Sequence, residues 1–400
     1  MSATETVASP PRLSLGALFL KFLRFGCLAF GGPVAQIAMV RQALVDEEKW
    51  IESPRFNRLL AVMQVLPGPE AHELCVHMGM VARGRIGGLL AGLGFMLPGF
   101  VLMLACGWAY AEWIAGRPGL AGVLLGVQVA VLAVIARSVQ RIGQHIVTGW
   151  LLAGVAGLAA VATLAGVPFW APLVAGAFAY GRAADKPAAA LALAAVIVLA
   201  AWLLLPHGDT APLVTGGISG GAATTTAALF LAGLKGGLLT FGGAYTAIPY
   251  VRADTVGRGW LTDGQFLDGV AIANLLPAPL VIFATFAGYV AGGLPGALAI
   301  TAGMFLPAFA FSMIFFERLE AVVEHPRLHR TLDGVAAAAV GIIAATVIQL
   351  AIAAADRLDR PLLALPIFAL AALAAWRAKG KWVTPAIVAA GAAAGAVVLG

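Results

Sequence analysis

The chain has 400 residues, of which 61% are hydrophobic and only 11% are charged. A soluble domain carries roughly 25% charged residues, so these side chains are too few to cover a water-exposed surface of this size. The composition excludes a cytosolic enzyme, and the scattered Lys and Arg behind the net charge of +6 exclude a nucleic-acid binder. It predicts an all-α integral membrane protein.

Apolar segments of about 20 residues, the length of a helix that crosses a bilayer, follow one another along the chain. We predict thirteen such transmembrane spans, or twelve if 144–181 forms a single span. The spans are expected at 13–40, 57–82, 86–110, 119–136, 144–163, 168–181, 187–205, 227–250, 266–290, 294–316, 332–353, 361–376 and 382–399. The segments 13–40, 57–82, 227–250 and 266–290 contain Gly-Gly or Pro-x-Pro interruptions and are predicted to be broken helices.

Motifs of the first half recur in the same order, at a nearly constant interval, in the second half. The matching motifs are Phe30-Gly31-Gly32 with Phe241-Gly242-Gly243, Val40-Arg41 with Val251-Arg252, Trp50-Ile51 with Trp260-Leu261, and Leu66-Pro67-Gly68-Pro69 with Leu276-Pro277-Ala278-Pro279. Chance does not preserve such an order, so we predict an internal duplication with repeats at 13–205 and 227–399.

The distribution of Lys and Arg among alternate loops predicts how the repeats are oriented in the membrane. The positive-inside rule puts the N-terminus in the cytoplasm, the loop after Arg41 outside and the loop after Arg252 inside. The repeats are then inverted, whereas a count of twelve spans would make them parallel. Inverted repeats with broken helices are typical of secondary transporters.

The interruptions and the arginines that follow them form a candidate anion site. Glycines would let backbone N–H groups at a helix start face an anion, and an arginine would add a full charge. The alternative is packing glycines with interfacial arginines, and helix breaks at the surface. The candidate substrate-binding residues are Gly31, Gly32, Arg41, Gln64, Pro67, Gly68, Pro69, Gly242, Gly243, Arg252, Asn274, Pro277 and Pro279.

Titratable residues follow the first proline pair, whereas apolar residues occupy the matching positions of the second half. They are Glu70, His72, Glu73 and His77. Of these, Glu70, Glu73 and His77 lie on one helix face. One interpretation is proton coupling, because intramembrane carboxylates and histidines are functional candidates by default. A divalent-metal site through Glu73 and His77, or a water-filled vestibule with local salt bridges, are the alternatives.

The glycine, arginine and proline motifs together match a known pattern. It consists of Phe25-Gly26, Phe30-Gly31-Gly32-Pro33, Arg41, Trp50 and Gln64-Val65-Leu66-Pro67-Gly68-Pro69, with a second copy in Thr240-Phe241-Gly242-Gly243, Pro249-Tyr250, Arg252, Trp260 and Asn274-Leu275-Leu276-Pro277-Ala278-Pro279. On these residues the chain resembles the chromate ion transporter family, as a long-chain member with two domains.

The resemblance implies a multi-pass protein of the bacterial plasma membrane that exports chromate, confers chromate resistance and uses the proton motive force. The expected partners are chromate, protons and the lipid bilayer, with no enzyme activity, cofactor or bound metal. Alternatives are a transporter of sulfate or another tetrahedral oxyanion, a divalent metal cation exporter, and a membrane scaffold that transports nothing. Assembly into a homo-oligomer is left open.

Overall fold

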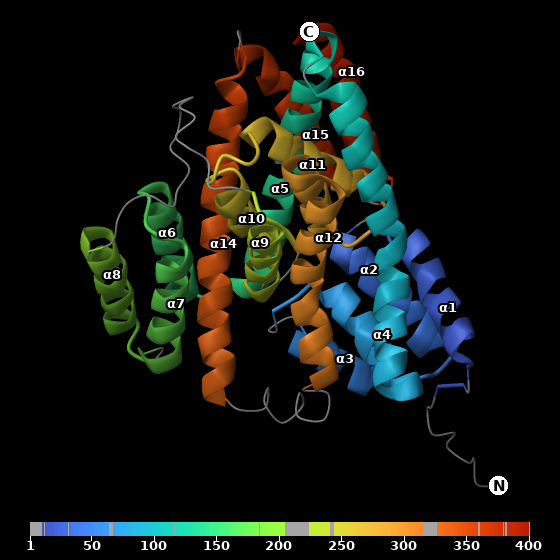
Figure 1. Ribbon diagram of the computed structural model, residues 1–400. Helices are drawn as coiled ribbons and strands as arrows, with labels where there is room; N and C mark the ends of the chain where they lie inside the picture. The colour runs from blue at the N-terminus through green and yellow to red at the C-terminus, as the bar shows by residue number, and fades with distance from the viewer. Residues whose placement is uncertain are drawn as a thin grey trace, which may run out of the picture.

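The computed structural model describes residues 10–11, 13–30, 32–63, 67–115, 117–183, 185–204, 224–240, 244–314, 326–358, 361–378, 380 and 382–399. Every regular element in these ranges is a helix, as predicted (Figure 1). The elements of the first half are α1 (Leu15–Cys27), α2 (Gly32–Arg41), η1 (Gln42–Glu47), α3 (Ser53–Met63), α4 (Glu70–Ala109), η2 (Tyr110–Ile114), η3 (Pro118–Leu120), α5 (Ala121–Ile146), α6 (Trp150–Leu164), α7 (Trp170–Ala183) and α8 (Pro187–Leu204).

The second half repeats the order of short and long helices. Its elements are α9 (Thr226–Leu238), η4 (Ala244–Thr246), α10 (Ala247–Thr255), α11 (Asp263–Leu275), η5 (Leu280–Ile282), α12 (Phe283–Ile314), α14 (Pro326–Ala355), η6 (Pro361–Leu363), α15 (Ala364–Arg377) and α16 (Val383–Val398). A capping box fixes the start of α11, because Thr262 and Gln265 exchange hydrogen bonds between side chain and backbone N–H.

The segments predicted to be broken are interrupted between α1 and α2, α3 and α4, α9 and α10, and α11 and α12. The first interruption reverses the chain, and Gly32 has a φ of 79°, a conformation that glycine adopts without strain. The chain comes back to α1 after η1, where Lys21 pairs with Glu48 and the ring of Phe22 lies 6.3 Å from that of Trp50. The segment 13–40 therefore differs from the single span expected, because hydropathy gives the length of an apolar run but not its direction.

The long helices α4 and α12 are each bent by the same pair of backbone conformations. Arg83 and Gly84 have φ/ψ of −145°/30° and 60°/−155°, and Gly292 and Gly293 have −151°/22° and 62°/−155°. Each bend folds a short inner arm onto a long arm: in α4 Gly79 touches Gly87, and α12 has the equivalent contact. We call 70–82 and 283–291 the inner arms, and 85–109 and 294–314 the long arms.

The two bent helices pack against each other in opposite directions. Gly107, near the end of the long arm of α4, lies against Tyr289 of the inner arm of α12. Gly92, near its beginning, lies against Phe309 of the long arm of α12. The long arms are therefore antiparallel, and α4 and α12 lie side by side (Figure 1).

Two long helices are exchanged between the halves. Helix α5 of the first half packs on α15 and α16 of the second, with Gly126 against Gly391 and Gly395. Helix α14 of the second half packs on α6 and α7 of the first, with Gly334 against Gly176. Glycines let these backbones approach closely, which is how helices pack where lipid removes the hydrophobic driving force.

Five segments among the described residues are long and apolar enough to cross a membrane. They are Glu70–Ile114, Ala121–Ile146, Pro187–Leu204, Leu280–Ile314 and Arg330–Ala355. Shorter apolar helices accompany them, and large apolar side chains such as Leu204 and Val397 are more than 80% exposed on the outer surface. The chain is thus a multi-pass membrane protein, while the number of thirteen spans stays a prediction.

Candidate functional site

The four interruptions meet at one buried place. The backbone N–H of Gly68, between α3 and α4, donates to the carbonyl of Thr240, after α9, over 2.8 Å. The Gln36 side chain on α2 donates to the carbonyls of Ala29, after α1, and Ala278, after α11, over 2.8 and 2.9 Å. All five residues are buried. We call this cluster the break junction.

Close packing against the long arms holds the break junction in place. Gly68, with a φ of 149°, packs on Ala308 of the long arm of α12. Gly99 of the long arm of α4 packs on the second break, where an added Cβ would lie 3.1 Å from Cα of Ala278 and 3.4 Å from the Pro277 carbonyl. Each proline break therefore rests on the long arm of the opposite half.

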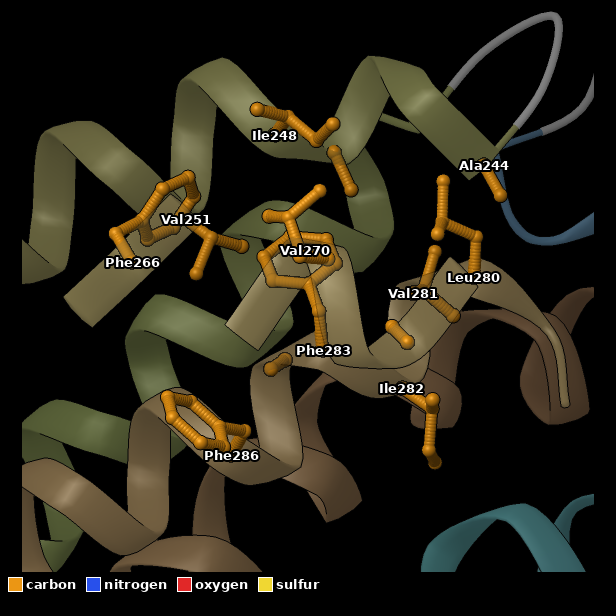
Figure 2. Packing of buried hydrophobic residues seen from close by; sticks show 14 of the residues in the cluster. Ala244, Ile248, Val251, Phe266, Val270, Leu280, Val281, Ile282, Phe283 and Phe286 are labelled. Atoms are coloured by element: carbon orange, nitrogen blue, oxygen red, sulfur yellow. The ribbon is translucent and has the colours of Figure 1, made fainter. Parts of the chain in front are cut away.

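Four helical segments begin at the junction and lead away from it. They are α2 at Gly32, α4 at Glu70, η4 with α10 at Ala244, and η5 with α12 at Leu280. Figure 2 shows the second-half part of this region, where the side chain of Leu280 is directed toward Ala244. The first N–H groups of a helix lack intrahelical partners and carry the positive end of its dipole, so this arrangement suits an anion.

The structure brings some predicted substrate residues to the junction. Pro67, Gly68, Pro69, Pro277 and Pro279 are buried there, and Gly32 begins α2 beside them. Asn274, one turn before the second break, accepts a hydrogen bond from the Tyr245 hydroxyl over 2.9 Å. Gly31, Gln64, Gly242 and Gly243 lie outside the described residues.

The two predicted arginines are not at the junction. Arg41 ends α2, about 13 Å along the helix from Gly32 at 1.5 Å per residue. It donates to Ser53 Oγ over 3.0 Å and to Asn57 Oδ1 over 3.3 Å.

Arg252 is in the matching place on α10 and reaches the start of α11. It donates to Asp263 Oδ1 over 2.7 Å and to Gln349 Oε1 over 3.1 Å. Each arginine thus ties the end of a short helix to the start of the next, and Arg252 already has a carboxylate partner.

The inner arm of α4 buries all four titratable residues predicted there. Glu70 is 8% exposed, His77 2%, and His72 and Glu73 not at all. The Glu73 carboxyl group lies against Gly68 of the junction. Neither of its oxygens has a hydrogen-bond donor among the described residues, an arrangement that is costly for a charged group.

His72 faces the opposite half. Its ring centroid lies 4.9 Å from that of Phe305 and 4.8 Å from that of Phe309, both on the long arm of α12. No ring nitrogen of His72 makes a hydrogen bond of ordinary geometry within the described part of the chain. The imidazole is therefore enclosed by aromatic edges at the contact between the halves.

Comparison with known proteins agrees with this architecture of two matching halves. The family model described as "Chromate transporter" matches residues 16–182 and again 227–396. The chain belongs to the chromate transporter family. It is 56% identical to the chromate transport protein of Pseudomonas aeruginosa, over 94% of this chain and 90% of that one.

Two further relatives extend over nearly the whole chain. The chromate transport protein of Cupriavidus metallidurans is 33% identical, over 92% of this chain and 90% of that protein. The probable chromate transport protein of Synechococcus elongatus is 30% identical, over 97% of this chain and 96% of that protein. No solved structure matches the chain. As a member of this family the chain is a membrane transport protein and not an enzyme.

Two residues of the break junction, Gln36 and Thr240, were not among the site residues predicted from the sequence. Gln36 is a lone polar residue between Ala35 and Ile37, and Thr240 directly precedes the second glycine pair. A polar side chain in an apolar run needs a hydrogen-bond partner, and this signal could have drawn attention to Gln36. The carbonyl of Thr240 matters through its backbone, which no sequence pattern reveals.

Proposed function

We propose that the chain exports chromate from the bacterial cytoplasm as a secondary active transporter. The observation that carries the proposal is the break junction, where four helical segments begin around one buried place, because the N–H groups at helix starts suit an anion. Relatives named as chromate transport proteins, which match over nearly the full length, support chromate as the anion. Resistance to chromate would follow from its removal from the cell.

The membrane potential favours this direction of transport. A dianion that leaves an inside-negative cell gains roughly 4.6 kcal/mol per 100 mV. That free energy corresponds to about three decades of concentration. Export therefore needs no nucleotide hydrolysis.

Proton coupling would use the inner arm of α4. Glu73 faces the junction without a donor, so a carboxyl group there is expected to carry a proton when the anion is bound. Loss of that proton would repel the dianion from the junction. Glu70, His72 and His77 are the further candidates for the proton path, since they are buried on the same arm.

Alternating access would follow from an inverted arrangement of the halves in the membrane. The antiparallel long arms and the exchange of α5 and α14 support this orientation. In such transporters one repeat rocks against the other around a fixed site near the membrane midplane. We assign Arg41 and Arg252 to holding the short helices during this motion, because each binds the start of the next helix.

Sulfate is the second candidate substrate, because backbone N–H groups recognise charge and shape, and sulfate resembles chromate in both. A divalent-cation exporter has less support. No group of three His, Cys, Asp or Glu side chains among the described residues could hold a metal ion. Within the described ranges, Glu73 and His77 therefore have no third ligand of these types for such a site.

Chromate uptake into everted membrane vesicles tests the proposal, because export then appears as accumulation. Respiring vesicles that contain the chain should accumulate chromate, and a protonophore should prevent this. Glu73→Gln, which is permanently neutral, should keep the uptake driven by the membrane potential and lose the uptake driven by a pH gradient alone, whereas Glu112→Gln, the same change at an exposed position, should lose neither.

Each negative result would remove a different part of the proposal. If vesicles with and without the chain accumulate equal amounts of chromate, the chain does not export it. If Glu73→Gln retains the uptake driven by a pH gradient alone, Glu73 carries no coupled proton.

A further inference from the structure

A second polar site lies at the other end of α11 from the break junction. It is a pocket of about 340 Å³ between the end of α4, the start of α5, the start of α11 and the end of α14. Its polar lining consists of Tyr110, Arg117, Thr262, Gln265, Asp268 and Arg357. The size is that of a small-molecule site.

The hydrogen-bond acceptors of this pocket are already occupied. Asp268, which is buried, accepts from Gln128 Nε2 over 2.7 Å on one carboxylate oxygen and from the Tyr110 hydroxyl over 2.8 Å on the other. The Gln128 side-chain oxygen accepts from Arg357 over 3.1 Å. The Gln265 side-chain oxygen accepts from the backbone N–H of Thr262 over 2.9 Å.

The polar groups that remain are donors. The Arg117 guanidinium has no side-chain partner within the described ranges, and Arg357 bonds there to Gln128 through one nitrogen alone. The side-chain nitrogen of Gln265 is equally free in the described part of the chain. Two arginines and one aspartate also give the lining a net positive charge. A ligand that fits must accept several hydrogen bonds and carry negative charge.

We propose that this pocket binds a small tetrahedral oxyanion between Arg117 and Arg357, as a vestibule for the transported anion. The inference rests on the proposed function for the identity of the anion. Helix α11 links the two sites: its first turn lines the pocket, and the break junction follows its last turn. Its 13 residues separate them by roughly 20 Å. An anion held here is concentrated at one end of the path without blocking the junction.

Binding of chromate to the purified full-length chain tests the pocket without requiring transport. The double variant Arg117→Gln/Arg357→Gln should weaken chromate binding about tenfold or more, because two charge-assisted donors are lost. Arg117→Lys/Arg357→Lys should retain most of the affinity. Arg258→Gln is the matched control, since it removes an exposed arginine that pairs with Asp254 outside the pocket.

Transport gives a second measurement. In vesicles the double Gln variant should raise the chromate concentration for half-maximal flux and leave the maximal flux close to that of Arg258→Gln. Equal chromate affinity and equal half-maximal concentration in the double Gln variant and Arg258→Gln would overturn the proposal. If the double variant fails to fold, the same two measurements on Arg117→Gln alone test the proposal. This single change should not disturb the fold, because Arg117 has no side-chain partner in the described ranges.

The outcomes separate the two proposals. If the chain binds chromate in the pocket but transports none across the membrane, the proposed function is contradicted and the proposed binding site is supported. If the chain exports chromate and the double Gln variant changes neither binding nor flux, the vestibule is contradicted and the proposed function is supported.

Discussion

The inner arms of α4 and α12 share a backbone but not a chemistry. Both follow a proline break, both end at a bend with nearly the same torsion angles, and both pack on the long arm of the opposite half. The arm of α4 begins with Glu70 and Glu73, whereas the matching residues of the second half are Leu280 and Phe283. The two inner arms thus share one geometry, and of the two only the arm of α4 carries buried titratable side chains.

The largest expected effect comes from filling the contact that both halves share. Gly99→Leu would force a side chain into Ala278 and the Pro277 carbonyl, which should destabilise the fold by about 3 kcal/mol or more. Transport and folded yield should both be lost. Thermal unfolding in detergent measures this, with Gly16→Leu as the control because nothing lies within 4 Å of that glycine. An unchanged unfolding temperature would mean that the break does not rest on α4.

Removal of Gln36 tests hydrogen bonds whose donor occurs in the first half only. Gln36→Leu leaves the carbonyls of Ala29 and Ala278 without their donor, and should cost about 1–3 kcal/mol. The matching residue of the second half is Ala247, so no equivalent bond compensates. Gln42→Leu, at an exposed position, is the control for the same measurement of unfolding. Equal stability of the two variants would contradict the role of Gln36.

The bends allow a symmetric test. Gly84→Val and Gly293→Val each place a branched side chain at a φ near 60° and a ψ of −155°, a region that essentially only glycine adopts, which should cost about 1–3 kcal/mol in both halves. No neighbour is close enough to clash, so the effect comes from the backbone alone. Gly119→Val, which also has open space around it, should be nearly neutral in chemical denaturation. A large effect in only one half would show that the bends are not equivalent.

The smallest effect is expected at the arginines. Arg252→Gln removes the charged partner of Asp263 and should cost about 1 kcal/mol, whereas Arg41→Gln loses bonds to neutral groups and should cost about 0.5 kcal/mol. Maximal chromate flux should stay near that of the wild type in both variants. A folded Arg41→Gln variant with no flux would show that Arg41 contributes to the anion site, as the sequence motif suggested.

Much of the architecture follows from local patterns. The Gly-Gly and Pro-x-Pro motifs mark the interruptions because their backbone preferences act within a few residues. Glu70, His72, Glu73 and His77 stand out because polar groups are rare in apolar runs.

Features that depend on distant partners could not be predicted in this way. The return of the chain to α1 after η1 depends on contacts such as the pair of Lys21 with Glu48, and the position of Arg252 depends on Asp263 and Gln349. The pocket around Asp268 combines residues from four elements that no single motif connects. Periodicity and spacing contain no information on such pairings.

The exchange of α5 and α14 also sets an order of events during synthesis. Gly126 of α5 leaves the ribosome long before its partners Gly391 and Gly395 on α16. At the usual speed of translation the interval is roughly 10–50 s. Throughout that time lipid or an insertion factor must cover the face of α5, so the first half waits in the bilayer as an unfinished intermediate until the C-terminus arrives.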